Sequence, residues 1–385
     1  MRVSRLELVD FRGYEAVQLP LPAGVTVIAG DNGQGKTSLL EAVAWAAMGK
    51  SFRGVPDAAL VRDGAEQAIV RVEIGGDGER ARRVEAELRT VGRNRVLLDG
   101  RPLGRTRDLL GALRVTVFAP DDLDLVKGGP AARRNYLDDL LVTVAPRYAA
   151  ASADYDRVLR HRNALLKGGV RDQDARATLD VFDDQLTTAG AEVVRGRLRL
   201  GDRLRPAIAA AYRDLASSTE DVGARYVAEW DDPGAPGVGA PGVGASGVAA
   251  PELDPDGVPE AMARALARLR PRELERGVTL VGPHRDEWAL AVAGLDARTR
   301  ASQGEQRTLA LALRLAGHRV VAEVTGEDPV LLLDDVFSEL DEHRGAALVE
   351  RLDATQTLIT TAGQLPDGVT ASSRLRVRAG VLEAA

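Results

Sequence analysis

The chain contains, at residues 30–37, the octapeptide Gly30-Asp31-Asn32-Gly33-Gln34-Gly35-Lys36-Thr37. A run of β-branched and apolar residues precedes it at positions 24–29, and this pattern predicts a buried strand. Residues 38–45 follow it with helix formers whose apolar side chains recur at helical spacing. A strand, a glycine-rich loop and a helix N-terminus in this order aim backbone N–H groups at one point. The segment therefore predicts a phosphate-binding loop, to which a chance glycine-rich turn is the alternative.

Each residue type in the octapeptide has a use in holding a nucleoside triphosphate. The glycines let the backbone approach the phosphates, Lys36 supplies a positive charge, and the Thr37 hydroxyl can ligate Mg²⁺. We therefore expect ATP and Mg²⁺ as cofactors and Lys36 as a catalytic residue. The ATP-binding residues expected in this segment are Gly30, Asp31, Asn32, Gly33, Gln34, Gly35, Lys36, Thr37 and Ser38.

A second part of this site is predicted near residue 330. Residues 330–333 read Val-Leu-Leu-Leu, a buried strand that ends in the carboxylates Asp334 and Asp335. In a phosphate-loop fold this is the Walker B pattern, in which Asp334 would bind Mg²⁺ and Asp335 would polarise the attacking water. Two adjacent acids could instead form a helix N-cap or a turn, but the phosphate loop upstream favours the metal site.

A third segment, residues 302–306, reads Ser-Gln-Gly-Glu-Gln before a predicted helix. A Ser hydroxyl and a glycine N–H at a helix start can bind an anion, although such a sequence alone is weak evidence. Beside a phosphate loop and a Walker B strand, it resembles the signature motif of the ABC ATPase superfamily, which caps the γ-phosphate held by a partner subunit. The resemblance implies an ATP-dependent homodimer and ATP contacts from Ser302, Gly304, Glu305 and Gln306.

The hydrophobic period divides the chain into three expected parts. In parts of residues 1–125, the expected N-terminal half of an ATPase head, apolar and polar residues alternate with period two. This pattern predicts an antiparallel sheet with one solvated face. Residues 126–270 change to helical spacing, which predicts two long antiparallel helices in a coiled-coil-like arm. Residues 271–385 are the expected C-terminal half of the head. Within the arm, residues 232–251 contain GAPGV-type repeats that predict a flexible surface loop.

Arginine accounts for 47 of the 51 basic residues, and GC-rich coding alone could explain this. Several arginines lie on the predicted polar face of the arm, where DNA binding competes with the alternative of a solvated surface paired with acids. We expect Arg195, Arg199 and Arg203 to contact the DNA backbone. The other basic residues assigned to this face are Arg157, Arg160, His161, Arg162, Arg197 and Arg205.

Composition limits the class of protein. The 385 residues are 45% hydrophobic and 28% charged, as in globular chains of two or three domains. The absence of Cys excludes disulfides and cysteine–zinc sites. The net charge of −6 argues weakly against a nucleic-acid partner, although local clustering matters more than the sum. No apolar run reaches the roughly 18 residues of a membrane span, and the N-terminus lacks a signal-peptide core, so we expect a cytoplasmic protein.

Two longer stretches are similar to signatures of the RecF family. One runs from Pro120 to Pro130 and continues with Arg133-Arg134-Asn135-Tyr136-Leu137-Asp138. The other runs from Leu332 to Leu348 and includes Ser338-Glu339-Leu340-Asp341 at the D-loop position. Residues 8–14 and 282–286 also resemble RecF, so the resemblance covers nearly the whole chain in order, apart from the repeat loop.

The resemblance implies an α/β fold: an ABC-type phosphate-loop ATPase head, with a mixed sheet plus an antiparallel β-subdomain, and an inserted antiparallel helical arm. It implies a weak, Mg²⁺-dependent, DNA-stimulated ATPase of recombinational repair, replication and the SOS response. Such a protein would dimerise on ATP, bind double-stranded DNA at gaps or single/double-strand junctions, and act with RecO- and RecR-type mediators to load RecA. Slow hydrolysis would reset it, in a nucleoid-associated cytoplasmic location without a membrane partner.

The sequence departs from the wider ABC pattern at several positions. Asp335 replaces the usual Glu, which implies slow hydrolysis, and Thr360-Thr361 stand where a switch histidine is usual. No Q-loop glutamine is evident near residues 118–121, and His284 could be structural or catalytic. Two other classes remain open: an ABC transport ATPase, which would lack the arm, and a structural chromosome clamp, which would need a longer coiled coil. A nuclease of the overcoming-lysogenisation type would need a larger domain after Asp335.

Overall fold

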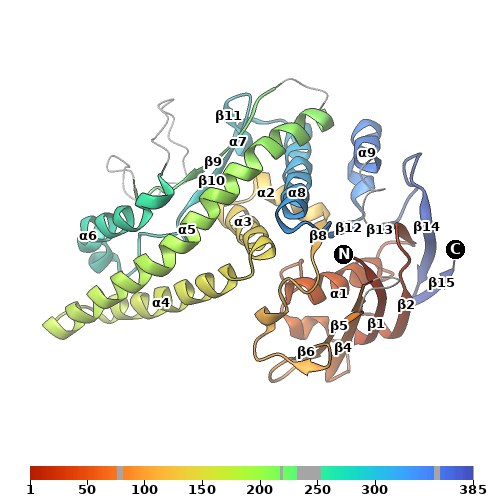
Figure 1. Cartoon of the computed structure of the whole chain (residues 1–385), viewed down its shortest axis with the longest axis horizontal. Helices are drawn as coiled ribbons and strands as arrows, with labels where there is room; N and C mark the ends of the chain where they lie inside the picture. The colour runs from red at the N-terminus through yellow and green to blue at the C-terminus, as the bar shows by residue number, and fades with distance from the viewer. Residues whose placement is uncertain (76–80, 217–219, 232–252, 351–355, 385) are drawn as a thin grey trace. The chain divides into compact units, whose positions relative to one another are not determined.

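The computed structural model of the chain describes residues 1–75, 81–216, 220–231, 253–350 and 356–384. The chain forms two compact units (Figure 1). Unit 1 comprises residues 1–122, 211–218 and 310–385, and unit 2 comprises residues 123–210 and 219–309. Residues 271–309 therefore group with the helical unit, whereas the sequence assigned them to the head. The repeat loop predicted at 232–251 lies outside the described residues.

Unit 1 contains a six-stranded sheet, here called the nucleotide sheet, with the order β15-β14-β3-β13-β12-β8. Every neighbouring pair is parallel except β14 and β15. Its central strands are short and buried throughout, as expected for parallel strands covered on both faces. The strands are β3 (Val25–Ala29), β8 (Val115–Phe118), β12 (Val330–Asp334), β13 (Thr357–Thr361), β14 (Ala371–Arg378) and β15 (Val381–Ala384).

The second sheet of unit 1 is antiparallel throughout, with the order β2-β1-β4-β5-β6-β7. Val70, Val72 and Ile74 point into the core and alternate with half-buried polar residues, so the predicted one-sided sheet is present. The strands are β1 (Val3–Phe11), β2 (Tyr14–Pro20), β4 (Gln67–Ile74), β5 (Arg82–Arg89), β6 (Arg95–Leu98) and β7 (Arg101–Pro102).

One hydrophobic core joins both sheets of unit 1 through helix α1 (Lys36–Met48). Trp45 of α1, Val70 of β4 and Leu332 of β12 are all fully buried members of this core. The burial of one helix against two sheets fixes the start of α1, and hence the phosphate loop, in place. The short elements of the unit are η1 (Asp57–Leu60), η2 (Thr106–Leu109), η3 (Pro120–Leu123), η5 (Val336–Glu339) and α9 (Glu342–Val349).

Unit 2 contains the predicted pair of long antiparallel helices, α4 (Tyr148–Gly168) and α5 (Gln173–Ala216), which lie side by side in Figure 1. The contacts between them show that the two helices run antiparallel. Tyr148 of α4 lies beside Gly196 of α5, whereas Tyr155, seven residues later in α4, lies beside the earlier Gly190. Helix α6 (Val258–Arg276) shares their core, in which Met262 is fully buried. The helices in the described ranges include no segment with the length and hydropathy of a bilayer-spanning helix.

The remaining elements of unit 2 were only partly expected. A three-stranded antiparallel sheet has the order β11-β10-β9, which pairs residues 222–227 with residues 287–292. This pairing explains why residues after 270 belong to the helical unit. The elements are α2 (Asp124–Lys127), α3 (Pro130–Val144), β9 (Val222–Val227), η4 (Pro255–Gly257), β10 (Glu287–Val292), β11 (Leu295–Asp296), α7 (Ala297–Arg300) and α8 (Gln303–Thr325), the last of which continues into unit 1.

Two arginines predicted on the polar face of the arm are buried instead. The Arg162 guanidinium, fully buried, donates to Asp183 Oδ1 at 2.7 Å and to Glu273 Oε2 at 2.6 Å, and so ties α4 to α5 and α6. Arg197 donates to both carboxylate oxygens of Asp138 at 2.7 Å. Their placement on the solvated polar face was wrong, because Arg162 pairs with the buried Asp183 and Glu273, and Arg197 is itself buried where it pairs with the half-buried Asp138.

Candidate nucleotide-binding site

The phosphate loop connects the end of β3 to the start of α1 and depends on glycine at two places. Gly30 has a φ of 157°, and a Cβ there would lie 2.5 Å from Val377 O of β14. Gly35 has a φ of 106°, and a Cβ there would lie 3.1 Å from the Tyr14 hydroxyl. The loop is therefore packed between two strands, one on each side, and a side chain at either glycine would displace it.

Lys36 opens α1, and its side chain folds back over the loop. Nζ donates to Gly30 O at 2.7 Å and to Asp31 O at 2.9 Å, and the residue is only 6% exposed. These bonds hold a buried ammonium at the loop carbonyls. The ammonium is thereby kept beside the loop N–H groups that the glycines free for an anion.

The strand order brings the Walker B strand to the phosphate loop. β13 lies between β3 and β12, and residues of all three segments meet at the carboxyl ends of the strands. Asp334 Oδ1 accepts from Thr37 Oγ1 at 2.8 Å and from Thr360 Oγ1 of β13 at 2.7 Å. Burial raises the pKa of Asp334 above its ordinary value, and the two hydroxyl donors act in the opposite direction.

Asp335 follows in a left-handed conformation with a φ of 51°, which Asp tolerates better than most residues. Its N–H donates to Thr360 O at 3.1 Å and lies 3.0 Å from Thr360 Oγ1. Its Oδ1 accepts a longer bond from Ala362 N at 3.4 Å. The backbone of Asp335 is thus fixed to β13, while its carboxylate is only partly buried and weakly held.

The donor set at Thr37 and Asp334 suits Mg²⁺. The ion prefers oxygen ligands and usually binds through one or two carboxylates together with substrate phosphates. A hydroxyl and a carboxylate oxygen 2.8 Å apart, beside a phosphate loop, supply the protein share of such a site. A nucleotide–Mg²⁺ complex therefore fits the residues present.

Two contacts that support the loop were not foreseen from the sequence. The Tyr14 hydroxyl donates to Gly35 O at 3.0 Å, and the Gln34 side-chain oxygen accepts from Ala379 N at 2.6 Å. Ala379 stands in the turn between β14 and β15. The quoted segment at residues 8–14 pointed to Tyr14, but no sequence signal pointed to Ala379.

The signature-like segment lies in unit 2 and starts α8. Ser302 and Glu305 form a capping box: Ser302 N donates to Glu305 Oε2 at 2.6 Å, and Glu305 N lies 3.3 Å from Ser302 Oγ. Hydrogen bonds from the Ser302 hydroxyl and, to a smaller extent, from the Ser302 backbone N–H to the carboxylate lower the pKa of Glu305. Gln306 is buried and donates to the carbonyls of Ala297 and Arg298 at 3.0 and 3.1 Å. Ser302 and Gly304 belong to a different unit from the phosphate loop.

His284 is a structural residue of unit 2. Its Nε2 lies 3.3 Å from Thr279 O, which can only accept, so Nδ1 accepts from the Tyr155 hydroxyl at 2.6 Å. Burial lowers the pKa of His284 to about 4. The imidazole is therefore neutral at physiological pH and fixes α4 to the loop that precedes β10.

The three arginines expected to bind DNA follow one another at steps of four along α5 and so share one helix face. Arg199 and Arg203 are exposed. Arg195 is half-buried and donates to Pro255 O at 2.8 Å and Asp256 O at 3.3 Å. Part of the hydrogen-bonding capacity of Arg195 thus goes to the loop before α6.

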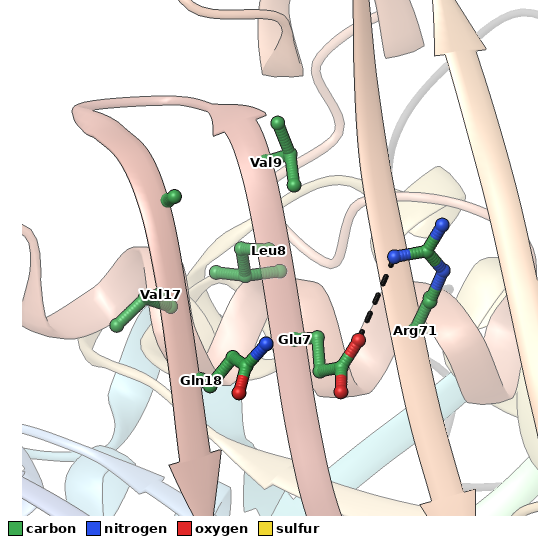
Figure 2. A pocket seen from close by; sticks show the side chains of 7 residues that line it. Glu7, Leu8, Val9, Val17, Gln18 and Arg71 are labelled. Atoms are coloured by element: carbon green, nitrogen blue, oxygen red, sulfur yellow. Dashed lines mark ion pairs between the residues drawn. The ribbon is translucent and has the colours of Figure 1, made fainter.

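A hollow on the antiparallel sheet of unit 1 lies over β1, β2 and β4 (Figure 2). Arg71 and Glu7 form an ion pair across it at 3.5 Å between Nη1 and Oε2, beside Leu8, Val9 and Val17. Its lining residues come from these three strands and include no residue of the phosphate loop or of β12. We therefore assign the nucleotide chemistry to the loop and not to this hollow.

Comparisons with a family model and with known proteins identify the same family. Residues 2–365 match the family model described as RecF/RecN/SMC N terminal domain. The chain is 46% identical over 368 residues to the DNA replication and repair protein RecF of Frankia alni, covering 94% of this chain and 93% of that protein. It is 45% identical over 383 residues to RecF of Kineococcus radiotolerans, covering 97% and 95%, and 42% identical over 392 residues to RecF of Streptomyces avermitilis, covering both completely.

Comparison with solved structures identifies the same family. Two structures of the recombination mediator protein RecF of the RecFOR pathway, RecF-ATPrS and RecF-ATP, match with TM-scores of 0.87 at 28% identity. The matches cover 100% of this chain and 98% and 97% of those chains. An Smc head domain from Pyrococcus furiosus has the same fold at a TM-score of 0.54 and 16% identity, covering 100% of this chain and 95% of that one. These matches confirm the expected ABC-type ATPase fold with its long helices.

Proposed function

Because the chain belongs to the RecF family of DNA replication and repair proteins, we propose that it is an ATP- and Mg²⁺-dependent DNA-binding ATPase that dimerises on ATP. The observation that carries this proposal is the 2.8 Å contact between Thr37 Oγ1 and Asp334 Oδ1, two residues 297 positions apart. Beside it lies Lys36, bonded to the loop. The RecF-ATP structure at 28% identity supports the same ligand here.

ATP binding is assigned to the whole loop. The backbone of Asp31 to Gly35, with Thr37 at the start of α1, would present N–H groups to the phosphates, whereas Gly30 N and Ser38 N donate to Thr361 O at 3.2 Å and Gly35 O at 3.1 Å and would contact ATP through other atoms. Lys36 exchanges its bonds to loop carbonyls for bonds to phosphate oxygens. Thr37 and Asp334 would hold Mg²⁺, which neutralises part of the phosphate charge when it is bound.

Hydrolysis is assigned to Asp335 as the general base. Its backbone is fixed by Thr360, and its partly exposed carboxylate, held by a 3.4 Å bond from Ala362 N, can turn to accept a proton from water. Asp is one methylene shorter than the Glu usual at this position, and we therefore propose slow, DNA-stimulated turnover. Slow hydrolysis keeps the dimer closed for long periods and then resets it.

Dimer closure is assigned to the N-terminus of α8 of the partner subunit. The Ser302 hydroxyl accepts from Glu305 N and also bonds to the Glu305 carboxylate within its own capping box, so on closure it would exchange that carboxylate for a γ-phosphate oxygen as its acceptor. The N–H groups of Gly304 and Glu305 add to this anion site. Gln306 stabilises the conformation of this segment, because its buried side-chain amide donates to two backbone carbonyls of α7.

The DNA partner is proposed to be double-stranded, at a gap or a single/double-strand junction, with RecO- and RecR-type mediators assisting the loading of RecA. Such a role places the protein at the nucleoid during the SOS response. Arg199 and Arg203, with a weaker share from Arg195, would contact phosphates and read no bases.

The test measures mass and DNA binding in the same samples. Light scattering gives the oligomeric state, and fluorescence anisotropy with a labelled duplex gives the affinity, each with and without Mg²⁺-ATP. The parent is expected to dimerise and bind DNA only with ATP. Lys36→Arg should do neither, because a planar guanidinium does not fit the loop, whereas the exposed Lys167→Arg should match the parent. Equal dimerisation and DNA affinity with and without ATP would refute the proposal.

A further inference from the structure

Strand β14 presents a row of three arginines on one face. Side chains two residues apart on a strand share a face, and Arg374, Arg376 and Arg378 are all exposed. The residues between them turn the other way: Val377 is 2% exposed in the unit 1 core, and Leu375 packs against that core. The strand is thus anchored by its apolar side and presents charge of one sign to solvent. We call Arg374, Arg376 and Arg378 the β14 arginine row.

Several other strand arginines of unit 1 are paired with acids. Arg71 lies between Glu7 and Glu85, with ion pairs at 3.5 and 3.1 Å, and Arg82 pairs with Asp99 at 3.4 Å. Within the described residues the three guanidinium groups of the row have no ion pair or hydrogen bond, although Glu383 lies directly across from Arg376 in the β14–β15 register. The row therefore retains its charge for an external anion.

The spacing of the row suits a chain of phosphates. Successive arginines are separated by two strand residues, or about 6.7 Å. One strand of duplex DNA rises about 3.4 Å per phosphate along the helix axis and also winds around it, so neighbouring phosphates lie roughly 7 Å apart, close to the spacing of the row. A guanidinium also presents a planar fork that matches phosphate geometry. We propose that the β14 arginine row is a DNA-backbone site on unit 1, separate from the arginines of α5; this inference rests on the proposed function.

The row is also joined to the nucleotide site, which favours DNA over a protein partner as its ligand. The turn that follows Arg378 begins with Ala379, whose N–H donates to Gln34 of the phosphate loop at 2.6 Å. Val377 O, on the same strand, packs against Gly30. A ligand whose binding depends on ATP would be expected on an element that contacts the loop directly, and the proposed ATP-dependent ligand is DNA.

The test uses the full chain with Mg²⁺-ATP and a labelled 50-base-pair duplex, with anisotropy titrations from 50 to 200 mM salt. The variant carries Arg374→Gln, Arg376→Gln and Arg378→Gln. Each phosphate contact contributes about 0.9 to the slope of log affinity against log salt, so the slope should become shallower by about 2.7. Between 50 and 200 mM salt, a slope difference of about 2.7 corresponds to a roughly 40-fold difference in how much the affinity falls. The matched control replaces three exposed arginines of the antiparallel sheet and its loops with Gln, namely Arg93 in the loop before β6, Arg95 of β6 and Arg101 of β7, and should change the slope by less than one unit.

The outcomes separate this inference from the proposed function. A parent that does not bind DNA with ATP overturns both. ATP-dependent binding by the parent with an unchanged slope in the β14 variant overturns only the β14 site. Unchanged DNA binding with lost affinity for a purified RecR-type mediator would do the same and make the row a protein-docking surface. Should the triple variant fail to fold, Arg376→Gln alone is expected to lower the slope by about 0.9, and no change would overturn the site.

Discussion

Replacement of Thr360 by Val removes one hydroxyl from the nucleotide site and nearly keeps the side-chain volume. Thr360 is fully buried, and its hydroxyl donates to Asp334 Oδ1 at 2.7 Å. Asp335 N loses a 3.0 Å contact but keeps its bond to Thr360 O at 3.1 Å. The main loss is therefore one hydrogen bond to a carboxylate, and such bonds contribute about 1.5–3 kcal/mol. We expect the free energy of unfolding at pH 7 to fall by about that amount.

Thr361→Val is the matched control, since its hydroxyl bonds only to the backbone of Gly363, at 3.1 Å in each direction. Loss of neutral bonds of this kind costs about 0.5–1.5 kcal/mol. Urea denaturation of both variants, without nucleotide, measures the difference. Titration with a fluorescent ATP analogue should also show weaker binding for Thr360→Val, because Asp334 is then held by Thr37 alone. A Thr360→Val variant no less stable than Thr361→Val would refute the assignment of β13 as a support for the carboxylate.

Three further predictions address closure, hydrolysis and pH. Ser302→Arg should abolish ATP-dependent dimers in light scattering but leave nucleotide binding by the monomer intact; an equal loss of monomer binding would place Ser302 in its own subunit's pocket. Asp335→Asn should lower turnover by about 10² to 10⁴ and lengthen the lifetime of the ATP-bound dimer after an ADP chase; a lifetime no longer than the parent's would remove Asp335 as the base. Burial raises the pKa of Asp286 to about 7 from an ordinary 3.8, so the stability present below pH 4 should be lost as pH rises through 7. Asp286→Asn should flatten that fall in urea denaturation between pH 5 and 8, and an unchanged pH profile would contradict it.

The sequence predicts those parts of the site that are local. The phosphate loop, its strand and its helix are contiguous, so residue type and spacing suffice to place Lys36 and Thr37. Asp334 could be joined to them only through the known pattern of phosphate-loop folds. The support from Thr360 depends on β13 lying between β3 and β12, and strand order is a property of the whole sheet.

Burial of charged residues on the arm shows a second limit. Arg197 and Arg199 are two residues apart, which is a rotation of about 200° around α5, so they lie on opposite sides of the helix and do not share the single polar face assigned to them. Arg197 is buried because Asp138 of α3 and Pro283 O approach it, whereas Arg199 is exposed. Periodicity separates the two residues, but which side of α5 is covered depends on Asp138 and Pro283, segments far away in the sequence.

The order of strands in the nucleotide sheet also governs when the site can form during synthesis. β3 is flanked by β13 and β14, and Val25 pairs with Thr357 and Ala371. A ribosome that adds about 5–20 residues per second reaches these partners roughly 20–60 s after it has made β3. For that time, both edges of an apolar strand have no native partner, a condition that favours slow folding and off-pathway strand pairing. The phosphate loop is thus translated early and acquires its fold late, so the growing chain cannot form its nucleotide site until both neighbours of β3 have been made.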